Sequence, residues 1–144
     1  MNEDLVTWLR AQLDEDERGA REAAERDSGE WFMGDRWNVY RIEDEARYDD
    51  DYQGEENRLV VYGNIKSQSE HIARHDPARV LAEVEAKRRI LDGWREADRE
   101  AHVDDGDERV AALMQGRLLA YQAVTRRLGL PYADRPGYRE EWRP

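Results

Sequence analysis

Two histidines, His71 and His75, stand four positions apart in the stretch SEHIARHDPARVLAEVEAKRRIL. On a continuous helix this spacing places both imidazoles on one side, where they can share a zinc ion. The zinc protease motif with this spacing has Glu directly after the first histidine, whereas Ile72 stands there in this chain. A third ligand has to come from His102 or from a distant carboxylate. We expect no cofactor, with zinc bound by the histidine pair as the alternative hypothesis.

The dipeptide Asp76-Pro77 suggests a structural role for the same histidines. Asp is a good N-cap and Pro is well tolerated at the first position of a helix, so a new helix is predicted to begin here. The preceding helix then ends at about His75, which loosens the geometry of the histidine pair. On this interpretation the two histidines cap or hydrogen-bond the junction between two helices.

Basic residues at and beyond this junction are candidates for binding an anionic ligand. Arg74 and Arg79 flank the junction and would act together with the histidine pair. Lys87 and Arg88, in the run KRR, are further candidates for contacting an anion or a phosphate group. In a chain this rich in charge, such residues usually form ion pairs along helix surfaces. Both interpretations stay open at the level of the sequence.

No complete set of catalytic residues is found. Glu22 and Glu25 meet the Glu-x-x-Glu spacing of all-helical, magnesium-dependent nucleotide pyrophosphohydrolases, but the second acidic pair that this chemistry needs falls at positions predicted to face solvent. The chain has no glycine-rich phosphate loop, no Gly-x-Ser-x-Gly motif and no cysteine. Nucleophilic cysteine chemistry and cysteine-bound zinc are therefore excluded. The sequence leaves enzymatic activity open and favours a protein that is not an enzyme.

The chain is strongly acidic, with a formal net charge of −11 and 40% charged residues. This charge disfavours general binding to nucleic acid, which requires Lys and Arg against the phosphates. The range 43–57 is predicted to be a solvated acidic loop or the tip of a long hairpin, whose acids keep the protein soluble. The alternative is that these acids contact a basic partner surface, as in proteins that mimic DNA. The candidate contact residues are Asp49, Asp50, Asp51, Glu55 and Glu56.

Membrane association is not expected. No apolar run approaches the length of a membrane span, and no signal-like apolar segment follows Met1. We therefore expect a cytoplasmic protein.

Apolar periodicity and turn residues predict the order of the secondary structure. Leu5, Trp8, Leu9 and Leu13 recur at helical spacing and predict a first helix with one apolar stripe. A capping box of Ser67 and Glu70 and, later, Gly129 followed by Pro131 mark helix ends. The expected elements are a helix over 2–26, strands over 31–33, 37–42 and 57–65, a short helix over 67–75, and long helices over 77–99 and 108–128.

The expected fold class is α+β. It consists of an N-terminal helix, a small antiparallel sheet of two or three strands, two longer helices and an extended aromatic C-terminal tail over about 130–144. The length of 144 residues predicts a single domain over 1–144. The density of aromatic residues in the tail, Tyr132, Tyr138 and Trp142, predicts that it docks onto the body. Because the core is lean, we expect a homodimer that buries Trp and Leu from the first helix.

Three blocks in a fixed order carry a family resemblance. DLVTWLRAQLDEDER, HIARHDPARVLAEVEAKRRIL and LPYADRPGYREEWRP resemble an uncharacterised family of small proteins from Streptomyces, related actinobacteria and their phages. The resemblance implies a phage, prophage or mobile-element origin, and no activity. The chain departs from the family pattern at RDSGEWFM and lacks the cysteines that some relatives have before the last block, so a cysteine-based metal site is absent here.

These observations favour a phage or mobile-element accessory protein that acts by protein–protein interaction, for example by inhibiting a host protein. The competing hypothesis is a small-ligand- or metal-binding protein, a sponge or weak hydrolase, that uses the region of His71 and His75.

Overall fold

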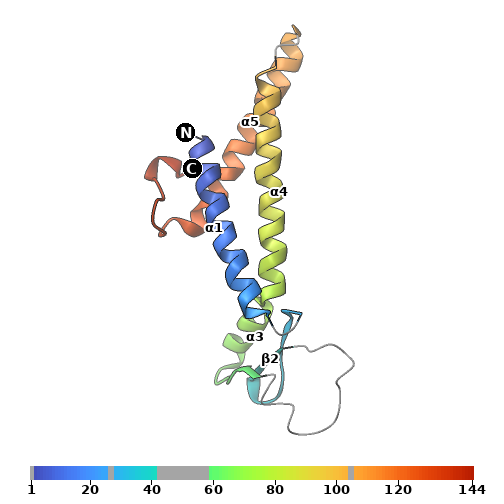
Figure 1. The fold of residues 1–144 in the computed structure, drawn as a ribbon, viewed down its shortest axis with the longest axis vertical. Helices are drawn as coiled ribbons and strands as arrows, with labels where there is room; N and C mark the ends of the chain where they lie inside the picture. The colour runs from blue at the N-terminus through green and yellow to red at the C-terminus, as the bar shows by residue number, and fades with distance from the viewer. Residues whose placement is uncertain (1, 26–27, 42–58, 104–105) are drawn as a thin grey trace. The chain divides into compact units, whose positions relative to one another are not determined.

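The computed structural model describes residues 2–25, 28–41, 59–103 and 106–144, and Figure 1 shows the order of their elements. The fold class is α+β, as predicted, with three strands in one antiparallel sheet. The elements are α1 (Asn2–Ala23), β1 (Trp31–Met33), the 3-10 turn η1 (Asp35–Trp37), β2 (Val39–Arg41), β3 (Leu59–Val61), α3 (Lys66–Arg74), α4 (Pro77–Ala101), α5 (Glu108–Gly129), and the 3-10 turns η4 (Leu130–Tyr132) and η5 (Glu140–Trp142).

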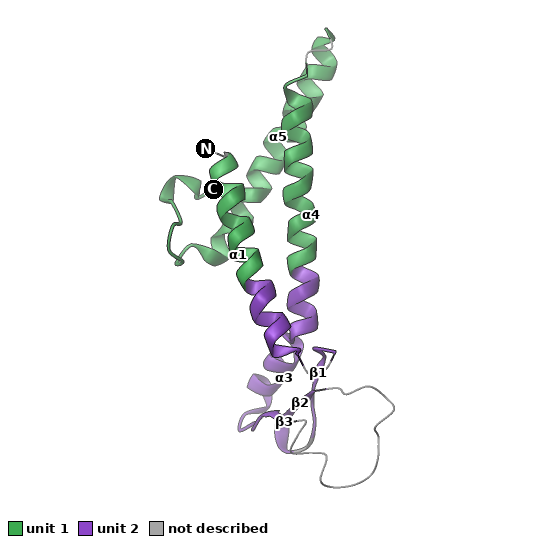
Figure 2. Ribbon diagram, viewed as in Figure 1, with its two compact units in different colours: residues 1–15, 84–144 green, residues 16–83 purple. Residues whose placement is uncertain are grey.

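The chain divides into two compact units, which Figure 2 colours separately. Unit 1 contains residues 1–15 and 84–144, and unit 2 contains residues 16–83. Each of the long helices α1 and α4 contributes one part to each unit. The single domain expected from the length stays a prediction, and the two units are described separately below.

The core of unit 1 forms around the first half of α1. Leu5, Leu9 and Leu13 recur at helical spacing and are each 1% exposed, as the apolar stripe predicts. They share this interior with buried residues of α4 and α5: Leu91, Trp94, Ala97 and Leu118. Burying one such leucine stabilises the fold by about 1.5–3 kcal/mol. The leucines expected at a dimer contact are thus already covered within the chain.

The C-terminal tail packs against α1 through aromatic rings. The ring centroid of Trp8 lies 5.6 Å from that of Tyr138 and 5.5 Å from that of Trp142. The indole N–H of Trp8 donates a hydrogen bond to the carbonyl oxygen of Pro136 over 3.1 Å. Gly137, with φ +86°, allows this close approach, because a side chain at this position would meet the Trp8 indole at 2.9 Å. Trp142 is 3% exposed, so the tail completes the core of this unit.

Unit 2 is built on a three-stranded antiparallel sheet in the order β1-β2-β3. Val39, at the start of the central strand, is fully buried. The junction before α4 is joined to this unit by hydrogen bonds. The backbone N–H of Trp31 donates to one carboxylate oxygen of Asp76 over 3.2 Å, and that of Arg79 donates to the other over 2.8 Å. Asp76 therefore caps α4, which begins at Pro77, as predicted.

Three local predictions were wrong in detail. α3 begins at Lys66 after Ile65 and has no side-chain cap, so Ser67 does not form the predicted capping box. Gly129 does not end α5 in a left-handed conformation; its φ is −75° and the chain passes directly into η4. α1 ends at Ala23, before the predicted end at residue 26. At Gly129 the chain continues through right-handed backbone, so no left-handed cap is required there.

Candidate functional site

The two histidines of the predicted metal pair lie at the C-terminal end of α3. Their ring centroids are 4.1 Å apart and their planes are inclined by 33°. The Nδ1–H of His75 donates a hydrogen bond to the carbonyl oxygen of His71 over 2.8 Å, and the backbone N–H of His75 donates to the same oxygen over 3.1 Å. His75 is thus the C-cap of α3, and its backbone and its ring both bond the carbonyl of His71 at the helix end.

In the part of the chain that the structure describes, no third metal ligand joins this pair. Among the described residues, no three His, Cys, Asp or Glu side chains gather in a way that would hold a metal ion. His102, the candidate third ligand, lies beside the carbonyl oxygen of Asp98, 2.6 Å from its Nδ1, just past the end of α4. Two of the three histidines therefore contact the carbonyl four positions earlier. Zinc binding by His71 and His75 stays a prediction.

Most of the candidate anion-binding cations contact other side chains. Arg79 pairs with Glu83 at 2.8 Å in unit 2. In unit 1, Arg88 pairs with Asp14 at 2.6 Å, and the Lys87 ammonium donates a hydrogen bond to the Tyr132 hydroxyl over 3.3 Å. Arg74 is exposed at the end of α3. These contacts fit ion-paired helix surfaces, and ligand binding by these residues stays a prediction.

The acidic candidates Asp49, Asp50, Asp51, Glu55 and Glu56 lie outside the described residues. The described helices do not combine the length and low polarity that crossing a membrane requires.

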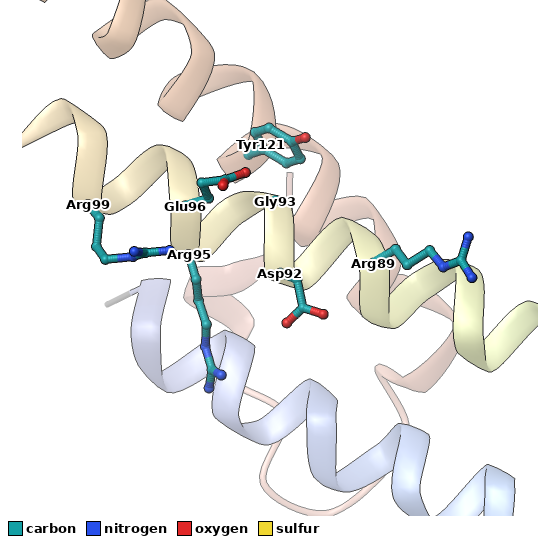
Figure 3. Close-up of a pocket in the computed structure, with 7 residues that line it drawn as sticks. All are labelled: Arg89, Asp92, Gly93, Arg95, Glu96, Arg99 and Tyr121. Atoms are coloured by element: carbon teal, nitrogen blue, oxygen red, sulfur yellow. The ribbon is translucent and has the colours of Figure 1, made fainter.

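A hollow of about 500 Å³ opens on unit 1 where α4 and α5 run side by side, and Figure 3 shows its lining. Gly93 makes room for Tyr121, because a methyl group at this glycine would lie 2.5 Å from the tyrosine hydroxyl. Figure 3 shows Glu96 pointing toward Tyr121, whereas Arg89 and Arg95 extend in different directions. The cations do not converge on one point where an anion would bind.

The carboxylates of this hollow are also paired. Asp92 binds Arg10 at 2.6 Å, and Glu96 binds Arg117 at 3.4 Å. Burial acts to lower the pKa of Arg117, but the charge of Glu100 and hydrogen bonds to Glu100 and Tyr121 outweigh it and raise that pKa above its usual value. Arg117 therefore stays charged at any physiological pH. The hollow belongs to a network of ion pairs that joins α4 to α5 and to the first half of α1.

Unit 2 carries a different feature, a set of large apolar side chains exposed to solvent. We call it the aromatic surface, and it consists of Phe32 (41% exposed), Trp37 (45%), Tyr62 (73%) and Ile65 (50%). Contacts through Tyr40 link Phe32 to Asn38, the residue that follows Trp37. The Asn38 amide donates to the Tyr40 hydroxyl over 3.1 Å, and the Tyr40 ring lies 5.7 Å from that of Phe32.

Strained backbone supports the aromatic surface. Arg36 and Trp37 both have left-handed φ values, +54° and +62°, which are uncommon for residues with side chains. Gly63 fits against them so closely that a methyl group there would lie 1.7 Å from the carbonyl oxygen of Trp37. The N–H of Gly63 donates to the Asn38 side-chain oxygen over 3.0 Å. These contacts hold η1 in place and leave Trp37 open to solvent.

The sequence alone did not point to this surface. Trp37 is the first residue of the predicted strand over 37–42, and Gly63 lies within the predicted strand over 57–65. The one available signal is the glycine itself, because a glycine inside a predicted strand indicates a close backbone approach.

The fold and these surfaces define a small α+β protein with a helical unit and a sheet-bearing unit. The chain belongs to the family of unknown function DUF6221, whose family model matches residues 2–144. No curated protein and no solved structure matches the chain.

Proposed function

We propose that this chain is a non-catalytic interaction protein that binds a partner protein through the aromatic surface of unit 2. The observation that carries the proposal is the exposure of Trp37 and Tyr62 on backbone held by Gly63. Exposed Trp and Tyr side chains are enriched at the centres of protein interfaces. A rigid support keeps the entropy cost of ordering them low when a partner binds.

The proposed partner has an apolar patch beside a basic one. Residues 42–58 lie in the sequence between β2, which directly follows Asn38, and β3, and they contain eight acidic residues and two arginines. Asp49 to Asp51, Glu55 and Glu56 would contact the basic patch and speed association at low salt. With the family resemblance, this favours an accessory protein of an actinobacterial phage or mobile element that acts in the cytoplasm on a host protein, without binding nucleic acid directly.

Crosslinking in a Streptomyces host tests the proposal. The wild-type chain and a Trp37→Ala, Tyr62→Ala variant would be crosslinked in cells, purified and analysed by mass spectrometry. A host protein enriched by the wild type should be lost with the variant and retained by a Val103→Ala control, which removes an apolar side chain that is 67% exposed in unit 1. Identical sets of captured proteins for all three chains would contradict the proposal.

The acidic segment is tested on the same complex. Changing Asp49, Asp50 and Asp51 to Asn, and Glu55 and Glu56 to Gln, should weaken binding and reduce its dependence on salt. Unchanged affinity and salt dependence would remove the acidic contact from the proposal.

A second candidate function is metal binding at His71 and His75. The observation that favours it is the stacking of the two exposed rings at 4.1 Å. Native mass spectrometry of the purified chain is the direct test. Added mass that matches zinc and disappears in a His71→Ala, His75→Ala variant would support the metal site, and an unchanged apo mass after incubation with zinc would exclude it.

A further inference from the structure

α5 exposes an apolar face that is separate from the aromatic surface. Leu113 is 68% exposed, Leu119 is 55% and Val124 is 40%. Exposed small residues lie between them on the same side of the helix: Ala112, Gly116, Ala120 and Ala123. The opposite side of α5 is the one that packs inside unit 1, through Leu118, Thr125 and Gly129. α5 is therefore apolar on its packed side and also on its exposed side. The exposed apolar side is available to contact a partner.

Gly116 makes this face unusual. A glycine in a helix interior costs about 1 kcal/mol relative to alanine. At Gly116 an added methyl group would meet nothing within 4 Å, so no contact described within the chain requires the absence of a side chain. A glycine at this position allows another helix to approach the α5 backbone closely, which gives a physical reason for Gly116.

The face is complementary to itself when two copies of α5 run in opposite directions. Gly116 and Ala120 lie symmetrically about Leu118, and so, within one residue, do Leu113 and Val124. In an antiparallel pair Gly116 of one copy therefore faces Ala120 of the other, which lets the backbones approach. Leu113 of one copy then packs against Val124 of the other, and this pair shields the edge of the contact from solvent.

The charges of α5 favour the same orientation. The first turn of α5 carries Asp107 and Glu108 beside one arginine, Arg109, whereas its last turn carries Arg126 and Arg127. An antiparallel pair places the acidic end of each helix beside the basic end of the other, and the helix dipoles oppose one another. A parallel pair would place arginines beside arginines. A basic partner is disfavoured at this face, because its positive charges would lie beside the arginines of the last turn.

We propose that the exposed face of α5 binds a second copy of this chain in antiparallel orientation, with Gly116 at the closest approach. α5 has 22 residues, which corresponds to a length of about 33 Å. A single helix pair of this length is at the small end of specific interfaces, so the dimer is reversible and its fraction rises with protein concentration.

Sedimentation velocity of the full chain tests the surface. Wild type, Gly116→Leu and Gly19→Leu would be compared from about 1 to 100 µM, the range in which a weak dimer forms. Both glycines are exposed helix positions with nothing within 4 Å of an added methyl group, so both substitutions should preserve or raise the melting temperature. Gly116→Leu should raise the Kd of the dimer by about tenfold or more. Gly19→Leu, in unit 2, should leave it unchanged.

Disulfide trapping tests the orientation. The chain has no cysteine, so single cysteines can be introduced without interference. A mixture of Leu113→Cys and Val124→Cys chains should oxidise mainly to the mixed dimer, whereas a parallel pair would trap each chain with itself.

Three results would overturn the proposal. They are a wild-type monomer at every concentration, a dimer that Gly116→Leu does not weaken, and trapping of like chains only. A wild-type monomer that sediments with phosphatidylglycerol vesicles would assign the face to an anionic membrane instead. The added leucine of Gly116→Leu should then strengthen vesicle binding, the opposite of its effect on the dimer.

Discussion

Aromatic side chains serve two different purposes in the two units. In unit 1, Trp8, Tyr138 and Trp142 contact one another and close the core beneath the tail. In unit 2, Trp37 and Tyr62 are exposed, and the strained backbone around Gly63 holds them there. The comparison shows that abundance of Trp and Tyr does not reveal their role. A buried aromatic side chain contributes to stability, whereas an exposed one that is held on strained backbone indicates a role in binding.

The largest expected effect separates two tryptophans. Trp142→Ala removes a side chain that is 3% exposed and should destabilise the protein by about 3–5 kcal/mol. Trp37→Ala removes one that is 45% exposed and should cost about 1 kcal/mol or less. Urea denaturation followed by circular dichroism measures both values. Equal losses of stability would mean that Trp37 belongs to the core and would end the contrast between the units.

A second comparison uses two glycines of unit 2. Gly63→Ala places a methyl group 1.7 Å from a backbone oxygen and should destabilise the protein by about 2–4 kcal/mol, because the strained turn has to move. Gly19→Ala, in α1 with nothing within 4 Å, should stabilise it by about 0.5–1 kcal/mol. The two denaturation midpoints should therefore shift in opposite directions. Tolerance of Gly63→Ala would show that Trp37 is not held by this contact.

The smallest effect concerns the end of the tail in unit 1. A hydrogen bond from Arg143 lowers the pKa of Glu140, against the effect of burial, and the charge of Arg143 adds to the lowering. Because the folded pKa is below the unfolded value of about 4.3, the contribution to stability is complete above that pH and is lost as the pH falls through the folded pKa. The melting temperature of wild type should thus exceed that of Glu140→Gln slightly at neutral pH.

The pH profile is the check on this last prediction. The difference in melting temperature between wild type and Glu140→Gln should narrow below about pH 4 and at high salt, since the pair is exposed. A difference that stays constant with pH would remove the ion pair as its cause.

Much of the architecture followed from local sequence. The stripe of Leu5, Leu9 and Leu13 predicted the buried side of α1, and the expected N-cap Asp76 accepts a hydrogen bond at the start of α4. The three-stranded antiparallel sheet was within the expected range. These features are predictable because apolar periodicity and capping depend on residues within one or two turns of each other.

The candidate sites were less predictable. The sequence singled out His71 and His75 for their spacing, but spacing does not show that His75 hydrogen-bonds the carbonyl of His71. It also placed the dimer contact on α1, whose leucines are buried, and gave no indication of the exposed face of α5. Which of two apolar sides of a helix remains exposed depends on how the other elements pack against it.

The sequence by itself determined the α+β class, the order of helices and strands, the acidic character and the helix that begins at Pro77. Only the tertiary structure decided the left-handed turn at Trp37, because its partner Gly63 lies far along the chain and their contact exists only after the sheet has formed. Short-range preferences are encoded in neighbouring residues. Exposure and strain arise from contacts between distant ones, which a single sequence does not specify.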